Sequence, residues 1–174
     1  FVHGYHPGAE DSAIYIPGIK MILDPSLYPF GREFFASHAR LTLFPDLVAA
    51  SVRFSHLPFD TVILVWYLVS IFLLLLASLR LSRILFKEDR AHWAGVTLLA
   101  GLLTLPVAGT ALYIVDQYLN PRALALFATL FATAAALQHK YLQVTLWILL
   151  AAAVHPLMAV FAASWIFSLL VGRR

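Results

Sequence analysis

The chain has 174 residues, of which 61% are hydrophobic and only 12% are charged. A soluble domain carries about twice that share of charged residues, so the composition predicts a protein of the lipid bilayer. The formal net charge of +3 requires no nucleic-acid partner, because basic residues at loop ends give such a balance, and the lack of cysteine excludes disulfides, thiolate zinc sites and thiol nucleophiles.

Residues 1–60 form a polar and aromatic half without a membrane-spanning run. The acidic pair at residues 10 and 11 is typical of a helix start, where backbone N–H groups are free. Pro17 interrupts the following apolar run, so we expect a firm helix only over residues 17–23, and then a turn. Residues 44–54 are amphipathic, and this half therefore predicts helices that lie along a membrane surface.

Residues 61–174 consist of apolar runs separated by short polar breaks. A helix rises about 1.5 Å per residue, so about 20 apolar residues cross the hydrocarbon core. Pro106 should kink the second run, while Asn120 and Pro121 predict a capped start for the third. The last three runs are short, so half-helices buried in protein are an alternative to full spans. The predicted spans lie near residues 61–79, 93–115, 121–138, 141–154 and 157–171.

Basic residues indicate how these spans are oriented. The loop between the first two spans is rich in lysine and arginine, and such short loops stay in the cytoplasm. Alternation then places residues 1–60 on the exoplasmic side, together with the breaks at 116–122 and 155–156. It also favours a hairpin over one long kinked helix for residues 141–171. The basic residues of the loop are Arg80, Arg83, Lys87 and Arg90.

The start of the exoplasmic segment resembles a motif of the GT-C class of membrane glycosyltransferases. Those proteins have a first helix, a long exoplasmic loop with juxtamembrane helices, and then many spans, with a catalytic acid near the start of the loop. Asp11 matches that acid, and Tyr15 matches a tyrosine found four residues later in lipid-linked sugar transferases. Glu10 precedes Asp11, whereas the companion acid of the family follows, so which of the two is the base stays open.

The resemblance implies an all-α, polytopic membrane protein with a GT-C-like fold in the bacterial cytoplasmic membrane. It implies transfer of a sugar from a polyprenyl-phosphate donor to an exoplasmic acceptor, and it is compatible with a divalent metal. The expected partners are the bilayer, the lipid-linked sugar and the remaining helices of a longer protein, because a long exoplasmic segment needs an earlier helix to carry it across. We accordingly expect this chain to be a fragment that lacks that first helix.

Sugar transfer with inversion needs a carboxylate that takes a proton from the acceptor, and donors that stabilise the departing phosphate. Glu10 and Asp11 are the candidate catalytic acids. Arg122 is the strongest candidate for the phosphate, because it lies in the first turn of a predicted helix where backbone N–H groups also favour anions. The predicted substrate-binding residues are Tyr15, Lys20, Asp116, Arg122 and His155.

Each candidate also has a simpler interpretation. The acidic pair can be a solvated helix cap. Asp116 can be an exposed residue just beyond a span, a partner of Arg122 or a substrate contact, and His155 can cap a broken helix. His3 and His6 lie in a stretch rich in glycine and proline, which favours a loop over a metal site. For the whole protein the alternatives are a non-catalytic multispan scaffold or a transporter subunit.

Overall fold

The computed structural model describes residues 4–106 and 113–172, and within them every regular element is a helix. This confirms the all-α class. The eight helices of the described part are α1 (Ser12–Leu23), α2 (Arg32–Ala39), α3 (Phe44–Ser55), α4 (Phe59–Leu85), α5 (Asp89–Leu102), α6 (Pro121–Leu137), α7 (Tyr141–Val154) and α8 (Pro156–Val171).

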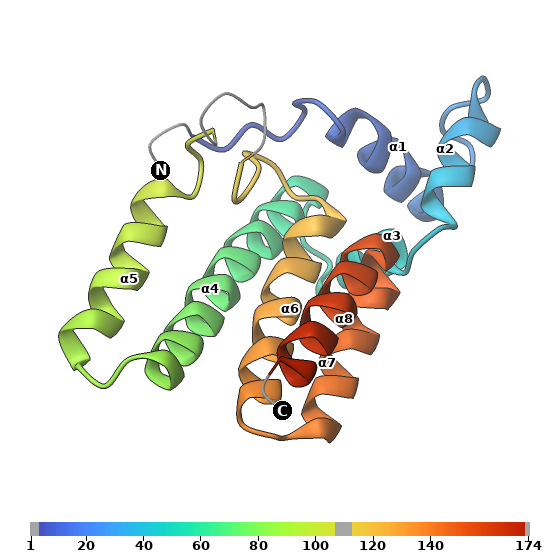
Figure 1. Cartoon of the computed structure of the whole chain (residues 1–174). Helices are drawn as coiled ribbons and strands as arrows, with labels where there is room; N and C mark the ends of the chain where they lie inside the picture. The colour runs from blue at the N-terminus through green and yellow to red at the C-terminus, as the bar shows by residue number, and fades with distance from the viewer. Residues whose placement is uncertain (1–3, 107–112, 173–174) are drawn as a thin grey trace.

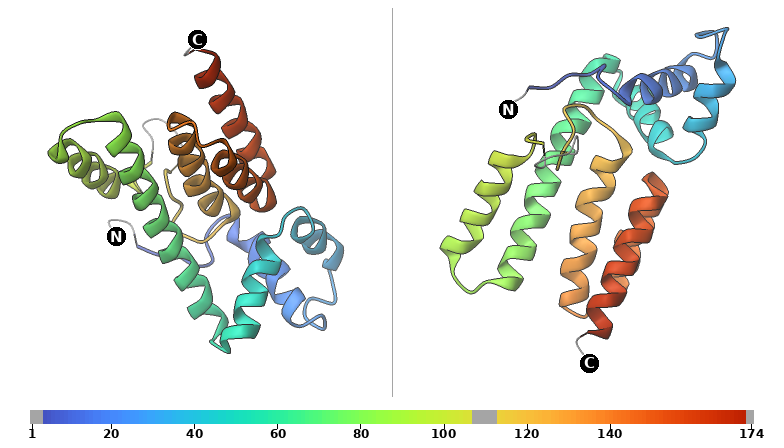
Figure 2. Two further views of the ribbon diagram at one scale, coloured as in Figure 1. Left: turned by 90° about the horizontal axis from the view of Figure 1, so that it is seen from below. Right: turned by 45° about the horizontal axis from the view of Figure 1, so that its top comes forward.

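The longer helices α4 to α8 form a bundle, and α1 to α3 lie across one end of it (Figure 1). Two further views agree on this arrangement (Figure 2). We call the end that carries α1, residues 113–120 and the break at His155 the loop end. The opposite end, with the turns at residues 86–88 and 138–140, is called the turn end (Figure 1).

Helix α6 forms the centre of the bundle, with α4 on one side and the α7–α8 pair on the other (Figure 1). Its small residues Ala125, Ala128 and Ala132 are completely buried. Small side chains let helix backbones approach closely, which is how helices associate where lipid replaces water. On the α4 side the core is completed by large buried side chains such as Tyr67 and Leu74.

Helix α4 is the one helix in the described part that is long and apolar enough to cross a membrane. Its 27 residues span about 40 Å, and it extends well beyond the predicted run 61–79 at its carboxyl end. Only 39% of its most apolar stretch is buried, unlike the core helix of a soluble protein. Leu64, Leu68 and Phe72 form an exposed apolar face at helical spacing, as contact with lipid requires.

The second predicted run differs from the expectation of one kinked span over residues 93–115. Helix α5 ends at Leu102, and residues 107–112 of that run lie outside the described residues. Pro106 has no N–H for the carbonyl of Leu102 and its ring would clash there, so the helix stops instead of bending. A tight turn follows, and Val115 donates its N–H to the carbonyl of Leu103 at 2.9 Å.

The amino-terminal half also departs from the sequence prediction. Helix α1 runs unbroken from Ser12 to Leu23 with Pro17 inside it, so the expected interruption is wrong. Helix α2 was not predicted at all. It packs on α1 where Gly18 leaves room, since a Cβ at that position would lie 3.1 Å from the Cβ of Ala39. Packing against α2 and α3 supplies the stabilisation that local sequence alone lacks.

The carboxyl-terminal runs are helices with the predicted limits to within one or two residues. Helices α7 and α8 pack against each other and against α6, with the break between them at His155. The chain therefore turns back at the loop end, and α8 ends at the turn end (Figure 1). This is the hairpin arrangement and not one long kinked helix.

Candidate functional site

A cavity of about 240 Å³ lies at the loop end, where four separate segments meet. Six of the seven predicted site residues line it, and Tyr118 and Asn120 complete the wall. The segments are the start of α1, the loop before α6, the first turn of α6 and the break between α7 and α8. The lining residues are Glu10, Asp11, Tyr15, Asp116, Tyr118, Asn120, Arg122 and His155.

Two contacts bring the acidic start of the chain to this position. The backbone N–H of His6 donates to the carbonyl of Gln117 at 2.7 Å, which ties the segment before α1 to the loop before α6. The ring of Tyr5 lies 4.9 Å from that of Tyr67 on α4. The acidic residues Glu10 and Asp11 line the cavity together with groups more than a hundred positions away in the sequence.

Asp116 forms the deepest charged group of the cavity. Its side chain is 7% exposed, and both of its oxygens accept hydrogen bonds from Nη2 of Arg122 at 2.5 Å. Nδ2 of Asn120 donates to Oδ2 of the same carboxylate. A charge this buried needs such partners, because loss of hydration is otherwise uncompensated. Asp116 is therefore paired with Arg122 as one interpretation predicts, and the interpretation as an exposed residue is wrong.

Arg122 keeps part of its donor capacity after pairing. One guanidinium nitrogen serves both oxygens of Asp116, so the remaining N–H groups are not used in this ion pair. The side chain is 33% exposed and faces the cavity. The pair therefore fixes the guanidinium in place while leaving it able to bind a further acceptor.

The first turn of α6 is built as the sequence predicts. The Oδ1 atom of Asn120 accepts a hydrogen bond from the N–H of Ala123 at 2.9 Å, and Pro121 occupies the first helical position. Asn120 thus acts twice, as a helix cap through its oxygen and as a donor to Asp116 through its nitrogen. Sequence analysis identified the first role but missed the second, because an asparagine cap gives no sign of what its amide nitrogen contacts.

The two acids at the start of α1 are not engaged in capping. Asp11 occupies the N-cap position, but its side chain accepts no capping hydrogen bond. Glu10 has a backbone φ of 48°, in the left-handed region that a glutamate seldom adopts. Strained backbone of this kind persists where surrounding structure enforces it, and it occurs often at functional sites. Both carboxylates remain exposed at the cavity and available to a ligand.

Two tyrosines, Tyr15 and Tyr118, line the cavity with neutral phenol groups. Burial raises the pKa of Tyr118 to about 12, with Asp116 and the acidic pair adding to the effect. Burial and the nearby Asp11 also raise the pKa of Tyr15. Both phenols therefore stay protonated at neutral pH and cannot serve as bases.

His155 is neutral and its tautomer is defined. Its Nδ1 atom accepts a hydrogen bond from the backbone N–H of Met158 at 3.2 Å, which caps the first turn of α8. The proton of the neutral ring must then be on Nε2. Burial lowers the pKa of His155, and the positive charge of Arg122 lowers it further. The ring is both a helix cap and a cavity residue that can donate from Nε2.

Lys20 is the predicted site residue that lies elsewhere. Its Nζ atom is 5.3 Å from the ring centroid of Phe59, in a cation–π contact at the α1–α4 junction, and it does not line the cavity. His3 lies outside the described residues, so the alternative of a metal site that includes it stays open. Within residues 4–106 and 113–172, no group of three histidine, aspartate or glutamate side chains is arranged to hold a metal ion.

The charges of the cavity are unbalanced. Three carboxylates face one guanidinium, since His155 is neutral, which gives a formal charge of −2 from three negative groups and one positive group. Because the net charge is negative, an anion in this cavity is attracted only by hydrogen-bond donors that point toward it from one wall. A group that develops positive charge is favoured on the side of Glu10 and Asp11.

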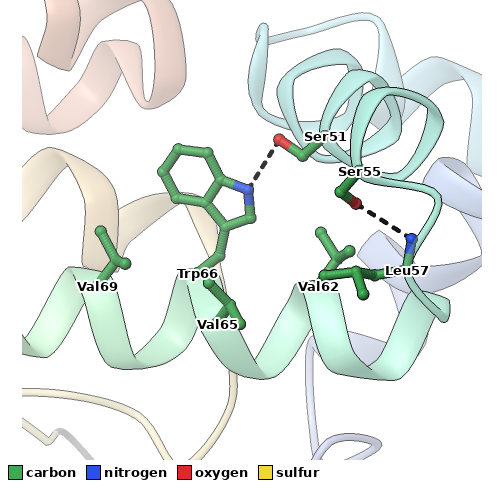
Figure 3. Close-up of a pocket in the computed structure, with 7 residues that line it drawn as sticks. All are labelled: Ser51, Ser55, Leu57, Val62, Val65, Trp66 and Val69. Carbon is green, nitrogen blue, oxygen red and sulfur yellow. Dashed lines mark hydrogen bonds between the residues drawn. The ribbon is translucent and has the colours of Figure 1, made fainter.

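A second cavity near the loop end has a different character (Figure 3). It holds about 260 Å³ between α3 and α4, and no titratable residue lines it. Its polar groups bind each other: the indole N–H of Trp66 donates to Oγ of Ser51 at 3.0 Å, and the backbone N–H of Leu57 donates to Oγ of Ser55 at 3.3 Å. This cavity offers apolar surface and no catalytic group.

Comparison with known proteins does not assign the chain. No protein-family model matches it, and neither curated proteins nor solved structures give a match.

Proposed function

We propose that this chain belongs to a polytopic membrane glycosyltransferase that uses a lipid-linked sugar donor. The observation that carries the proposal is the convergence of Glu10, Asp11, Asp116, Arg122 and His155 on one cavity at the loop end of an apolar bundle. In this arrangement the loop end faces the exoplasm and the turn end faces the cytoplasm of a bacterial cell. The donor keeps its polyprenyl tail in lipid and brings its phosphate to the cavity.

The exposed surface of the bundle supports insertion into lipid. Exposed apolar side chains cover α7 and α8 as well as α4, for example Leu146 and Phe161. Polar side chains such as Ser70 and Thr133 are buried inside and bond to helix carbonyls. Apolar side chains outside, and inward polar side chains that bond to the helix backbone as these two do, are the arrangement expected of helices in a bilayer.

Asp11 is the proposed general base. Its carboxylate lines the cavity and makes no capping bond, so it is free to accept the proton of an acceptor hydroxyl. As the proton moves to Asp11, the acceptor oxygen attacks the anomeric carbon and the bond between that carbon and the phosphate oxygen breaks. The departing polyprenyl phosphate keeps the electron pair. Glu10 lies alongside and favours the positive charge that develops on the sugar.

Arg122 and His155 are the proposed donors to the departing phosphate. Asp116, itself bonded by Asn120, holds Arg122 so that its unused N–H groups are preorganised. The Nε2–H group of His155 supplies a second donor, and the tyrosines supply neutral ones. The described residues do not fit a three-ligand metal site, so no step of this mechanism uses a metal.

The test is the Asp11→Asn variant of the full-length protein in membranes. Loss of the base should lower the release of polyprenyl phosphate from a panel of radiolabelled polyprenyl-phosphate hexoses by about 100-fold or more. Asp46→Asn is the matched control, because Asp46 is an exposed acid at the same end that lies outside the cavity. Equal turnover by wild type and by a correctly inserted Asp11→Asn variant contradicts the catalytic assignment.

A further inference from the structure

A third cavity is lined by residues from the carboxyl-terminal parts of α4 and α6, which lie at the turn end, and it shares no lining residue with the acidic cavity. It holds about 400 Å³ between these two helices. Its walls are apolar along their length and carry two arginines from the last turns of α4. The lining side chains used below are Leu76, Leu79, Arg80, Arg83, Ile84 and Phe131.

Arg80 is a partly buried cation without a carboxylate partner among the described residues. Its Nη2 atom donates to Oε1 of Gln143 on α7 at 3.2 Å, and its Cζ atom lies 6.0 Å from the ring centroid of Phe131 on α6. An amide and an aromatic ring orient the guanidinium but do not neutralise it. A charge in this position gains from an anion that enters the cavity.

Arg83 adds a second positive charge to the same face. It follows Arg80 by three positions, so the two side chains are neighbours on the helix surface. Arg83 is exposed, and no ion pair involves it within residues 4–106 and 113–172. The helix dipoles place about half a negative elementary charge at each of the carboxyl ends of α4 and α6, and these charges repel an anion. Together they are smaller than the two positive charges of the arginines.

We propose that this cavity binds an anionic phospholipid of the cytoplasmic leaflet. The phosphate of the headgroup contacts Arg80 and Arg83, and one acyl chain lies along Leu76, Leu79 and the ring of Phe131. The positive charge at the membrane surface and the apolar wall below it match the two parts of one phospholipid. The proposal is independent of sugar transfer, but it rests on the part of the proposed function that places the bundle in a bilayer with its turn end toward the cytoplasm.

Lipid binding is tested on the full chain in detergent by native mass spectrometry with phosphatidylglycerol and phosphatidylcholine. Wild-type chain should retain phosphatidylglycerol in preference to phosphatidylcholine. The Arg80→Gln/Arg83→Gln variant should weaken that retention by about tenfold or more. The matched control is Lys87→Gln/Arg90→Gln, which removes the same charge from the same end outside the cavity and should change retention by less than about twofold.

A steric variant separates the cavity from general surface charge. Leu79→Trp leaves both arginines in place but fills the apolar wall, and it should also weaken phosphatidylglycerol binding. If Arg80→Gln perturbs the fold, judged by circular dichroism, the exposed Arg83→Gln change alone provides the charge test. Equal retention of both lipids by wild type overturns the proposal. An equal loss of phosphatidylglycerol retention in the Lys87→Gln/Arg90→Gln control also overturns it. The same holds if inorganic phosphate alone displaces the lipid, or if Leu79→Trp disrupts dimers of the chain without any effect on lipid retention.

Discussion

The buried ion pair between Asp116 and Arg122 gives the most direct test of the cavity's architecture. Asp116→Asn keeps the shape of the side chain but removes its charge, and it turns an N–H group toward Nη2 of Arg122. Breaking a fully buried pair costs about 3–5 kcal/mol. Arg122 is 33% exposed, so water compensates part of that loss. We expect a decrease of about 2 kcal/mol in the free energy of unfolding.

The assay is thermal unfolding of the purified chain in detergent micelles, followed by helical circular dichroism. For a chain of this length, 2 kcal/mol corresponds to a fall in Tm of about 4–8 °C. A double-mutant cycle with Arg122→Gln isolates the pair itself. The loss of unfolding free energy in the double variant should be smaller than the sum of the losses in the two single variants by about 1 kcal/mol or more. Glu88→Gln is the control, because this exposed acid should alter stability by less than about 0.5 kcal/mol.

The cycle can refute the reasoning directly. If the losses in the two single variants add up to the loss in the double variant to within about 0.5 kcal/mol, the carboxylate and the guanidinium do not interact in the folded chain. Arg122 would then be a mobile surface cation, and the argument that Asp116 preorganises it for a phosphate would fail. A loss in Glu88→Gln as large as in Asp116→Asn would show that net charge, and not this contact, determines stability.

Three further outcomes follow from the structure. Because the pKa of His155 in the folded chain lies below the unfolded value of 6.5, the unfolded chain binds the proton more readily. The free energy of unfolding should therefore fall as the pH drops below about 6.5. Thermal unfolding should show a smaller loss for His155→Gln than for wild type. The chain has no cysteine, so membrane-impermeant labelling of single-cysteine variants at Asp11 and His155 should occur from one face of the membrane, and labelling at Lys87 from the other. The buried hydroxyl of Tyr67 has no hydrogen-bond partner in the described structure, so Tyr67→Phe should leave the free energy of unfolding unchanged or raise it by about 1 kcal/mol, as thermal unfolding will show.

Local chemistry explains which elements the sequence predicts well. Asn120 and Pro121 define the start of α6 through groups only three residues apart, and that cap forms as expected. His155 and Pro156 mark the break between two apolar runs in the same way. Each signal lies within one helical turn, so no knowledge of the distant chain is needed.

Distant contacts account for what the sequence does not predict. Pro17 lies inside an unbroken helix because α2 and α3 pack against α1, and the sequence of α1 carries no trace of those neighbours. Asp116 resembles an exposed loop residue in the sequence, but in the structure its side chain is buried and bonded to Asn120 and Arg122. Lys20 was grouped with the site because of its charge, but the helix directs it toward Phe59. Charge predicts which residues can bind a phosphate, and packing decides which of them meet.

The charge balance of the cavity limits how a phosphate can be bound there. Because Glu10 and Asp11 add two carboxylates to the paired Asp116, the net charge of the cavity disfavours an anion. Binding therefore requires donors of fixed direction, and the structure provides them through Arg122, held from behind by Asp116, and through Nε2 of His155. The same excess of negative charge favours a sugar that becomes positive as its bond to phosphate breaks. In the proposed function, an acidic cavity with one anchored guanidinium would stabilise the transition state of transfer more than the bound donor, which is the condition for catalysis.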